Sequence, residues 1–225
     1  MANRQLPKSQ HGILSGIRVL DLSTMIAGPS CTRTLGEYGA EVIKIDSPHP
    51  HAGPRLMCWL PIEVGQGKRS ILLDLQQDKG LEIFWKLVDS ADVLVHNLRT
   101  GVAEKLGIGY EAVKARKPAI IYTQICAFDG PDPGPWAMRP GYDPVLQAAT
   151  GIMARYGGKG KPELHGIAGC IDYITGYNAA FGIALALLRR RQKKDLDGDY
   201  VKTSLCQGAQ SLQVPFMHTL NEHRD

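Results

Sequence analysis

Short apolar runs alternate with amphipathic stretches through the first half of the chain. Residues 16–23, 40–45 and 70–75 are rich in Ile, Leu and Val and are bounded by glycine or polar residues, which is typical of buried strands. Between the first two runs, residues 27–30 combine a Gly-Pro break with helical spacing afterwards, and Gly39 predicts the end of that helix. A strand, a helix and a strand within about thirty residues form the β-α-β unit of a parallel sheet.

The alternation continues beyond this unit. Residues 79–88 predict a helix, 91–96 a strand, further helical turns extend to Arg116, and 119–125 predict a fifth strand. This order favours an α/β fold, namely a doubly wound, Rossmann-like and mostly parallel sheet with flanking helices. Residues 47–68 interrupt the order with a long loop that contains Pro, Gly and His, and a loop of that length is typical of a functional segment.

The pattern becomes less regular after Cys126. Residues 129–135 are dominated by Pro, Gly and Asp and predict a turn-rich, lid-like loop. A helix is predicted over 143–154, a long helix over 173–193, and a last strand over 200–205.

Composition excludes several classes of function. The 225 residues carry a net charge of +4 that is spread along the chain, so we expect no nucleic-acid partner. The five cysteines are scattered without a C-x-x-C pair, which predicts neither a disulfide framework nor a metal site. The N-terminus has no signal-peptide pattern, and the apolar stretch 179–188 is too short to span a bilayer. We therefore expect a cytoplasmic protein with no membrane partner.

Motifs for nucleotide cofactors and for serine hydrolysis are missing from the sequence. The first strand-to-helix turn, 24–30, has one glycine followed by proline instead of G-x-G-x-x-G. Residues 65–69 lack the spacing of a Walker loop, and no G-x-S-x-G pentapeptide occurs. These observations argue against NAD, ATP and serine-hydrolase chemistry, and no permanently bound cofactor is predicted.

Six segments, taken in order, carry a resemblance to a known family. They are GIRVLDLS with Ala-Gly-Pro at 16–29, GAEVIKID at 39–46, KRSILLD at 68–74, ADVLVHNLRTG at 91–101, RPGYDPVLQ at 139–147 and DYITG at 172–176. Each segment alone is weak, but the ordered set, from about residue 13 onward, resembles the class III CoA-transferases. That family (CaiB/BaiF) includes formyl-CoA transferase, carnitine CoA-transferases and α-methylacyl-CoA racemase.

The resemblance implies a particular domain organisation. Residues 1–12 would be a flexible N-terminus, and 13–225 would form the family's large Rossmann-like domain, incomplete at its C-terminal end. By the same resemblance, the family's second, small domain would lie outside this sequence. Members of the family form interlocked dimers, so the resemblance implies a homodimer or a missing C-terminal partner chain. An exposed apolar surface is then expected around residues 205–217.

The resemblance also implies a reaction and its site. CoA would move from an acyl-CoA donor to a carboxylic acid acceptor through an aspartyl-CoA thioester, with Asp172 as the nucleophile. Taken by itself, Asp172 would read as a helix N-cap, a role that Asp favours. Substrate and CoA contacts are implied for Ile26, Ala27, Gly28, Arg99, Arg139, Tyr142 and Asp143. The two arginines suit the phosphates of CoA.

Two departures from the family pattern narrow the reaction. Ile26 stands where formyl-CoA transferases carry Gln, so recognition of a small oxalate-like acid is not expected. Tyr142 stands where the racemases carry His, and a phenol with its high ordinary pKa suits proton abstraction poorly. A racemase-like isomerase is therefore one alternative. A non-catalytic or split CoA-binding module that needs a C-terminal partner is the other.

Overall fold

The computed structural model describes residues 12–49, 60–128, 134–165, 169–193 and 197–217. Residues 1–11 of the predicted N-terminal segment 1–12, and residues 129–133 of the predicted lid 129–135, lie outside these ranges. The strands are β1 (Arg18–Asp21), β2 (Glu41–Asp46), β3 (Arg69–Leu72), β4 (Val93–His96), β5 (Ile121–Cys126) and β6 (Asp199–Ser204). The helices are α1 (Ala27–Glu37), α2 (Leu60–Val64), α3 (Asp78–Ser90), α4 (Val102–Lys105), α5 (Tyr110–Arg116), α6 (Asp143–Ala149), α7 (Ile152–Gly157), α8 (Cys170–Lys193) and α9 (Leu205–Met217).

The six strands form one parallel sheet in the order β3-β2-β1-β4-β5-β6. The predicted doubly wound α/β fold is confirmed by this order. The direction of winding reverses between β1 and β4, and in such sheets the crevice at the carboxyl ends of those two strands is the usual place for a ligand. Asp21 at the end of β1 lies opposite Val95 of β4 in the register.

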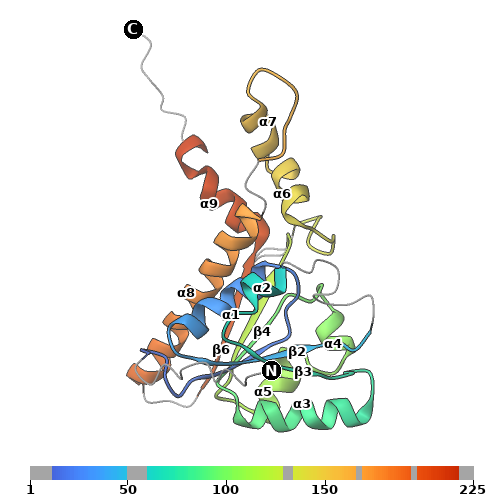
Figure 1. Cartoon of the computed structure of the whole chain (residues 1–225), viewed down its shortest axis with the longest axis vertical. Coiled ribbons are helices and arrows are strands. Elements are labelled where there is room, and N and C mark those ends of the chain that lie inside the picture. The colour runs from blue at the N-terminus through green and yellow to red at the C-terminus, as the bar shows by residue number, and fades with distance from the viewer. Residues whose placement is uncertain (1–11, 50–59, 129–133, 166–168, 194–196, 218–225) are drawn as a thin grey trace, which may run out of the picture.

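Helices cover both faces of the sheet (Figure 1). On one face α1 and α8 pack over Val19, Val95 and Ile121. On the other face the side chains of α3 and α5 pack over the alternate strand residues, Leu20, Leu94 and Tyr122. Because both faces are covered, the central strands are mostly apolar, although β5 also buries Thr123 and Gln124, and their sequences therefore resemble hydrophobic runs.

Several boundaries differ from the sequence-based expectation. The single helix predicted over 143–154 is two helices, because Gly151 adopts a left-handed backbone with φ 81° between them. The long loop 47–68 contains the short helix α2. The long helix begins at Cys170 rather than at Tyr173, so Asp172 lies inside its first turn.

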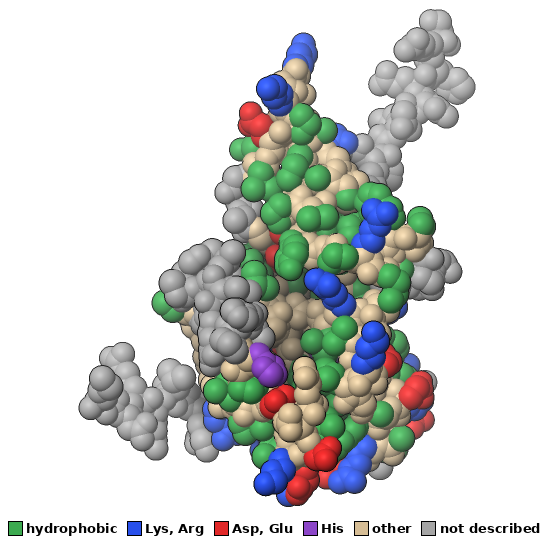
Figure 2. Space-filling view, turned by 90° about the vertical axis from the view of Figure 1, so that its right-hand side faces the viewer, with side chains coloured by type: hydrophobic (Ala, Val, Ile, Leu, Met, Phe, Trp, Pro, Cys, Tyr) green, Lys and Arg blue, Asp and Glu red, His purple; other side chains and the backbone are tan. Residues whose placement is uncertain are grey.

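A projecting part, formed by α6, α7 and α9, extends away from the sheet (Figure 1). Hydrophobic side chains gather on one face of that region, while many charged ones lie at the opposite end of the molecule (Figure 2). Exposed apolar side chains of α6, α7 and their flanks include Tyr142, Val145, Tyr156 and Leu164.

Helices α8 and α9 also expose apolar side chains. In α9, where an apolar surface was expected, Leu212 and Val214 are exposed. A longer stripe runs along α8, where each exposed side chain lies about one turn from the next: Tyr177, Phe181, Leu185 and Leu188.

Helix α8 is long and apolar enough to cross a membrane, by length and composition only. The sequence-based expectation concerned the stretch 179–188 alone, whereas the span that meets this criterion is the longer Cys170–Gln192. Its other side nevertheless packs against α1 and the sheet through Ile171, Ala179 and Ile183. That packing is typical of the core helix of a globular domain.

Candidate active site

Helices α1 and α8 approach each other so closely that glycine is required at their contact. A Cβ on Gly176 would lie 2.1 Å from Ser30 Oγ and 2.5 Å from the carbonyl oxygen of Ala27. A Cβ on Gly208 would lie 2.1 Å from Thr175 Oγ1, so α9 closes on α8 in the same way. The Thr-Gly end of the DYITG segment thus packs the helices together, and the half-buried Asp172 precedes this contact in the first turn of α8.

The N-terminus of α8 is capped by a residue from another helix. Asp143 is buried, and its Oδ2 accepts hydrogen bonds from the backbone N–H of Ile171 (2.7 Å) and of Asp172 (3.3 Å). Its Oδ1 accepts a bond of 2.6 Å from Gln147 Nε2, and Gln147 Oε1 accepts one of 2.8 Å from the His165 N–H. A carboxylate in this position satisfies N–H groups that a helix leaves without partners and opposes the positive end of the helix dipole. Asp143 is therefore a helix cap, but for α8 rather than for its own helix.

The environment of Asp172 makes its carboxylate reactive. Burial, and to a lesser extent repulsion from the neighbouring Asp143 carboxylate, together raise its pKa from the usual value to about 7. Among the described residues, no hydrogen bond or ion pair reaches the Asp172 carboxylate. A partly desolvated carboxylate without a cation beside it suits nucleophilic attack or proton transfer.

The turn between β1 and α1 lies beside the first turn of α8. Ile26 is the residue before α1, and its Cδ1 lies 3.1 Å from the position of a Cβ on Gly169. Ala27 and Gly28 follow as the buried first residues of α1. The structure thus brings four of the predicted site residues, Ile26 to Gly28 and Asp143, to the region around Asp172.

The remaining predicted site residues lie at the surface. Arg99 is exposed in the loop after β4, and its guanidinium makes no hydrogen bond or ion pair with the described residues. Arg139 is exposed too, with its guanidinium 5.1 Å from the centre of the Trp136 ring. Tyr142, 57% exposed, immediately precedes Asp143 at the start of α6. No interaction joins these three side chains to Asp172 within the described part of the chain.

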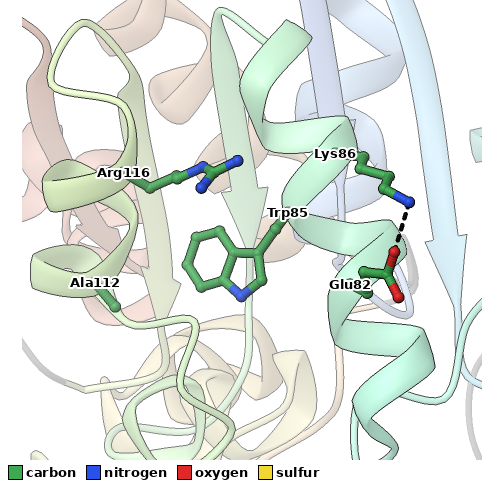
Figure 3. A pocket seen from close by; sticks show the side chains of 5 residues that line it. All are labelled: Glu82, Trp85, Lys86, Ala112 and Arg116. Atoms are coloured by element: carbon green, nitrogen blue, oxygen red, sulfur yellow. Dashed lines mark hydrogen bonds and ion pairs between the residues drawn. The ribbon is translucent and has the colours of Figure 1, made fainter.

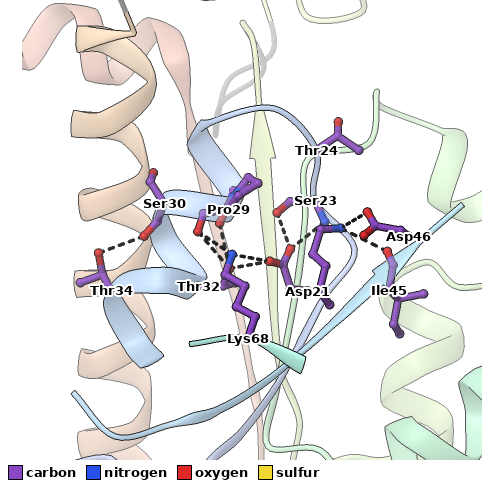
Figure 4. Close-up of polar contacts among 12 residues, drawn as sticks. Asp21, Ser23, Thr24, Pro29, Ser30, Thr32, Thr34, Ile45, Asp46 and Lys68 are labelled. Atoms are coloured by element: carbon purple, nitrogen blue, oxygen red, sulfur yellow. Dashed lines mark hydrogen bonds and ion pairs between the residues drawn. The ribbon is translucent and has the colours of Figure 1, made fainter. Parts of the chain in front are cut away.

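The sequence analysis missed a buried ion pair beneath α1. Lys68 Nζ lies 2.9 Å from Asp21 Oδ2, 2.7 Å from Thr32 Oγ1 and 2.8 Å from the carbonyl oxygen of Pro29 (Figure 4). Ser23 adds hydrogen bonds from its N–H and its hydroxyl to the other oxygen of Asp21. Burial acts to raise the pKa of Asp21, but the Lys68 ammonium and these bonds outweigh it and hold the pKa below its usual range. The sequence feature that could have indicated this ion pair is Asp21, a charged residue at the end of a buried apolar strand.

A second missed contact joins the loops after β1 and β4. Asn97 Oδ1 accepts a hydrogen bond of 2.8 Å from the Thr24 N–H, and Asn97 Nδ2 donates one of 2.8 Å to the Thr24 carbonyl. These bonds continue the β1–β4 ladder, in which the Leu22 N–H donates to the Val95 carbonyl, beyond the ends of the strands. They therefore join the two loops that follow β1 and β4, at the point where the sheet reverses its winding.

A pocket on the opposite face of the sheet contains none of the predicted site residues. It lies between α3 and α5, with Trp85 and Ala112 in its wall (Figure 3). Its cations already have partners, since Lys86 pairs with Glu82, and Arg116 pairs with Asp89. The pocket therefore offers no free charge for a ligand.

Comparison with known proteins identifies relatives that match nearly the whole of this chain but are longer than it. The chain is 34% identical over 210 residues to the CoA-transferase/lyase DddD of Marinomonas sp. (strain MWYL1), covering 93% of this chain and 25% of that protein. It is 35% identical to the succinyl-CoA–L-malate CoA-transferase beta subunit of Chloroflexus aurantiacus, covering 85% of this chain and 49% of that one. The chain thus spans half or less of the length of these relatives.

A solved structure and a family model agree with these matches. The crystal structure of a CaiB/BaiF family protein from Brucella suis superposes with a TM-score of 0.80 at 33% identity, covering 92% of this chain and 56% of that one. The model of CoA-transferase family III matches residues 14–224, which includes every predicted site residue from Ile26 to Asp172. The fold, the ordered segments and this match together establish that the chain belongs to CoA-transferase family III.

Proposed function

We propose that this chain is the CoA-binding, nucleophile-bearing part of a CoA-transferase, and that Asp172 is the nucleophile. The observation that carries the proposal is the raised pKa of a partly buried carboxylate, in the first turn of α8, that has no cation beside it among the described residues. Such perturbed carboxylates concentrate at functional sites. Membership of CoA-transferase family III supplies the reaction class.

In this proposal the reaction is a series of acyl-transfer steps at the Asp172 carboxylate. An oxygen of Asp172 attacks the thioester carbonyl carbon of the donor, the C–S bond breaks, and CoA leaves as a thiolate from a mixed anhydride. The thiolate then attacks the aspartyl carbonyl carbon, releases the donor acid as a carboxylate and leaves an aspartyl-CoA thioester. The acceptor carboxylate repeats both exchanges in reverse, and Asp172 is regenerated. No net proton transfer is required, which fits a site in which Asp172 has no basic partner.

The surrounding residues supply binding and orientation in this proposal. Asp143 orients the first turn of α8 and keeps the pKa of Asp172 high. The backbone of Ala27 and Gly28 lines the CoA site, and the exposed guanidinium groups of Arg99 and Arg139 contact its phosphates. Tyr142 borders the acyl group. Ile26 presents an apolar side chain, so it selects against a small polar acid that needs a hydrogen bond there.

The relatives suggest which substrates to test first. A protein named succinyl-CoA–L-malate CoA-transferase is among them, so dicarboxylic acids and their CoA esters are the substrate class that we infer. We also propose a cytoplasmic location. We propose a homodimer or a C-terminal partner chain as well, because relatives of this chain are named as beta and alpha subunits of one CoA-transferase. A racemase-like reaction is less favoured, because Tyr142 takes the place of an imidazole base.

A non-catalytic CoA-binding module remains the second candidate. It is favoured by the apolar stripe on α8, Tyr177, Phe181, Leu185 and Leu188, whose exposure suits a chain that is completed by another one.

Peptide mass spectrometry after incubation with a panel of acyl-CoA esters and hydroxylamine tests both candidates. A hydroxamate on the peptide that contains Asp172, absent from the Asp172→Asn variant, is the expected result. Measurable CoA binding without a hydroxamate would replace the proposal by the non-catalytic module. If the chain neither binds CoA nor forms an adduct, both candidates are overturned for this chain.

A further inference from the structure

The turn that leads from β1 into α1 holds a strained residue. Met25 has φ 64°, the only positive φ of a non-glycine residue in the described part of the chain. A side chain in the left-handed region costs free energy, and such residues persist only where their surroundings hold them in place. They concentrate at functional sites, so what holds Met25 in this conformation bears on the site beside it.

Two sets of bonds fix the turn, one on either side of Met25. On the N-terminal side, the carboxamide of Asn97 bonds both the N–H and the carbonyl of Thr24, each at 2.8 Å. On the C-terminal side, Lys68 Nζ bonds the carbonyl of Pro29 at 2.8 Å, and Lys68 is itself buried against Asp21. The bonded residues Thr24 and Pro29 flank the segment 25–28 on its two sides (Figure 4).

The fixed segment borders the first turn of α8. Ile26 Cδ1 is within van der Waals reach of Gly169, the residue just before α8, and the Ala27 carbonyl packs against Gly176. A shift of the turn would therefore move residues that pack against α8 on either side of Asp172, at Gly169 and Gly176. Positional errors of about 1 Å near reacting groups cost large factors in rate or binding.

We propose that Asn97 is a positioning residue of the Asp172 site. It takes no part in chemistry and holds the strained Met25–Ala27 turn in its binding conformation before any CoA ester arrives. The inference rests on the proposed function, since the turn matters only if CoA binds beside it. It assigns a role to a residue of the ADVLVHNLRTG segment that neither caps a helix nor belongs to the buried core.

Two substitutions separate the hydrogen bonds from the shape of the side chain. Asn97→Asp keeps the size and the acceptor for the Thr24 N–H, but it sets a carboxylate oxygen against the Thr24 carbonyl. Asn97→Ala removes both bonds. Tyr122→Phe is the matched control, because it removes a buried hydrogen bond of 3.1 Å to the Ile108 carbonyl on the opposite face of the sheet.

Hydrogen exchange of the peptide around residues 22–28 is measured first, together with the melting temperature. We expect Asn97→Ala and Asn97→Asp to speed exchange in this peptide about tenfold, the factor that a lost hydrogen bond represents. Tyr122→Phe should lower the melting temperature about as much as the Asn97 variants do, but it should leave hydrogen exchange in this peptide unchanged. Unchanged exchange in both Asn97 variants would overturn the inference.

Affinity for coenzyme A, measured by calorimetry, decides whether the held turn serves the site. We expect both Asn97 variants to raise the Kd for coenzyme A about tenfold, and Tyr122→Phe to leave it unchanged. Faster exchange with an unchanged Kd would assign Asn97 a purely structural role and overturn the inference, while the proposed function would stand. A wild-type chain that binds no coenzyme A would instead refute the proposed function, and with it the positioning role.

Discussion

At the scale of single residues, Asp172 is set apart by where its helix begins. Because α8 starts at Cys170, the Asp172 carboxylate lies in the first turn instead of capping the helix from outside. The cap is Asp143, so two carboxylates lie close together, and only one of them has hydrogen-bond donors. Burial and this repulsion raise the pKa of Asp172 to about 7. Two predictions follow from that value.

The first prediction concerns the pH dependence of acyl transfer. Only the ionised carboxylate attacks a thioester, so kcat/KM, or the rate of hydroxamate formation, rises with pH and levels off above about 7. Asp143→Asn removes the repulsive charge and moves this limb to lower pH. A rate that is already at its plateau at pH 5 would contradict the assignment.

The second prediction concerns the free energy of unfolding. The folded-state pKa of the Asp172 carboxyl group is raised, so its contribution to the free energy of unfolding is fully present below the unfolded-state pKa, near 4. That contribution is lost as the pH rises through the folded-state pKa of about 7. Asp172→Asn is therefore expected to equal the wild type in stability at pH 4 and to exceed it by about 1–3 kcal/mol at pH 8. Urea unfolding at both pH values measures the difference. The control Asp197→Asn, at an exposed position, should show no such dependence on pH.

At the scale of elements, glycines decide how closely the helices around the site pack. Gly176 lets α8 lie against the backbone of α1, and Gly208 lets α9 lie against Thr175. The far end of α8 is tied to the sheet, where Arg190 bonds Asp92 and the Ala119 carbonyl. Arg190 is therefore a specific anchor between α8 and the strands.

The contact between α1 and α8 gives the third prediction. Gly176→Ala places a methyl group 2.1 Å from Ser30 Oγ and 2.5 Å from the Ala27 carbonyl, and backbone atoms cannot yield cheaply. We expect a loss of about 2–4 kcal/mol in the free energy of unfolding. Asn178→Ala, at an exposed position of the same helix, is the control and should change stability little. Equal stabilities of the two variants by urea unfolding would mean that the helices are not so closely packed.

At the scale of the whole molecule, one buried ion pair joins segments that are far apart in the chain. Lys68 follows the long loop 47–67, and Asp21 ends the first strand, yet their side chains are only 3% and 0% exposed. The pair therefore links the region of α2 and β3 to the β1–α1 turn beside the site. Burying two charges is costly, so the geometry and the additional hydrogen bonds must compensate.

The fourth prediction tests this link. Lys68→Met leaves the buried Asp21 carboxylate without its direct ion-pair partner and is expected to lower the free energy of unfolding by about 3–5 kcal/mol. The double variant Asp21→Asn with Lys68→Met should recover most of that loss, because no charge is then left unpaired. As a control, Arg116→Met breaks the exposed pair with Asp89 and should have a much smaller effect. A double variant as unstable as Lys68→Met alone would disprove the charge argument.

Much of the fold followed from local pattern. The apolar runs around Val19, Val42 and Ile121 form strands whose side chains enter the two buried cores, and their mostly apolar character is visible in the sequence itself. Boundaries were less exact, since Gly151 divides a predicted helix and α8 starts three residues early. A glycine in a helical pattern does not reveal whether its φ will be positive.

The sequence by itself determined the alternating elements, the family segments and the position of Asp172 within them, because each of these depends on residues close together in the chain. Only the tertiary structure decided what surrounds that carboxylate. Asp143 lies 28 residues before Ile171, Asn97 lies 73 residues after Thr24, and Lys68 lies 47 residues after Asp21. The crossover connections determine which strands and helices lie side by side, and therefore which distant residues come into contact. Hydrophobic periodicity contains no information about which polar side chains these will be.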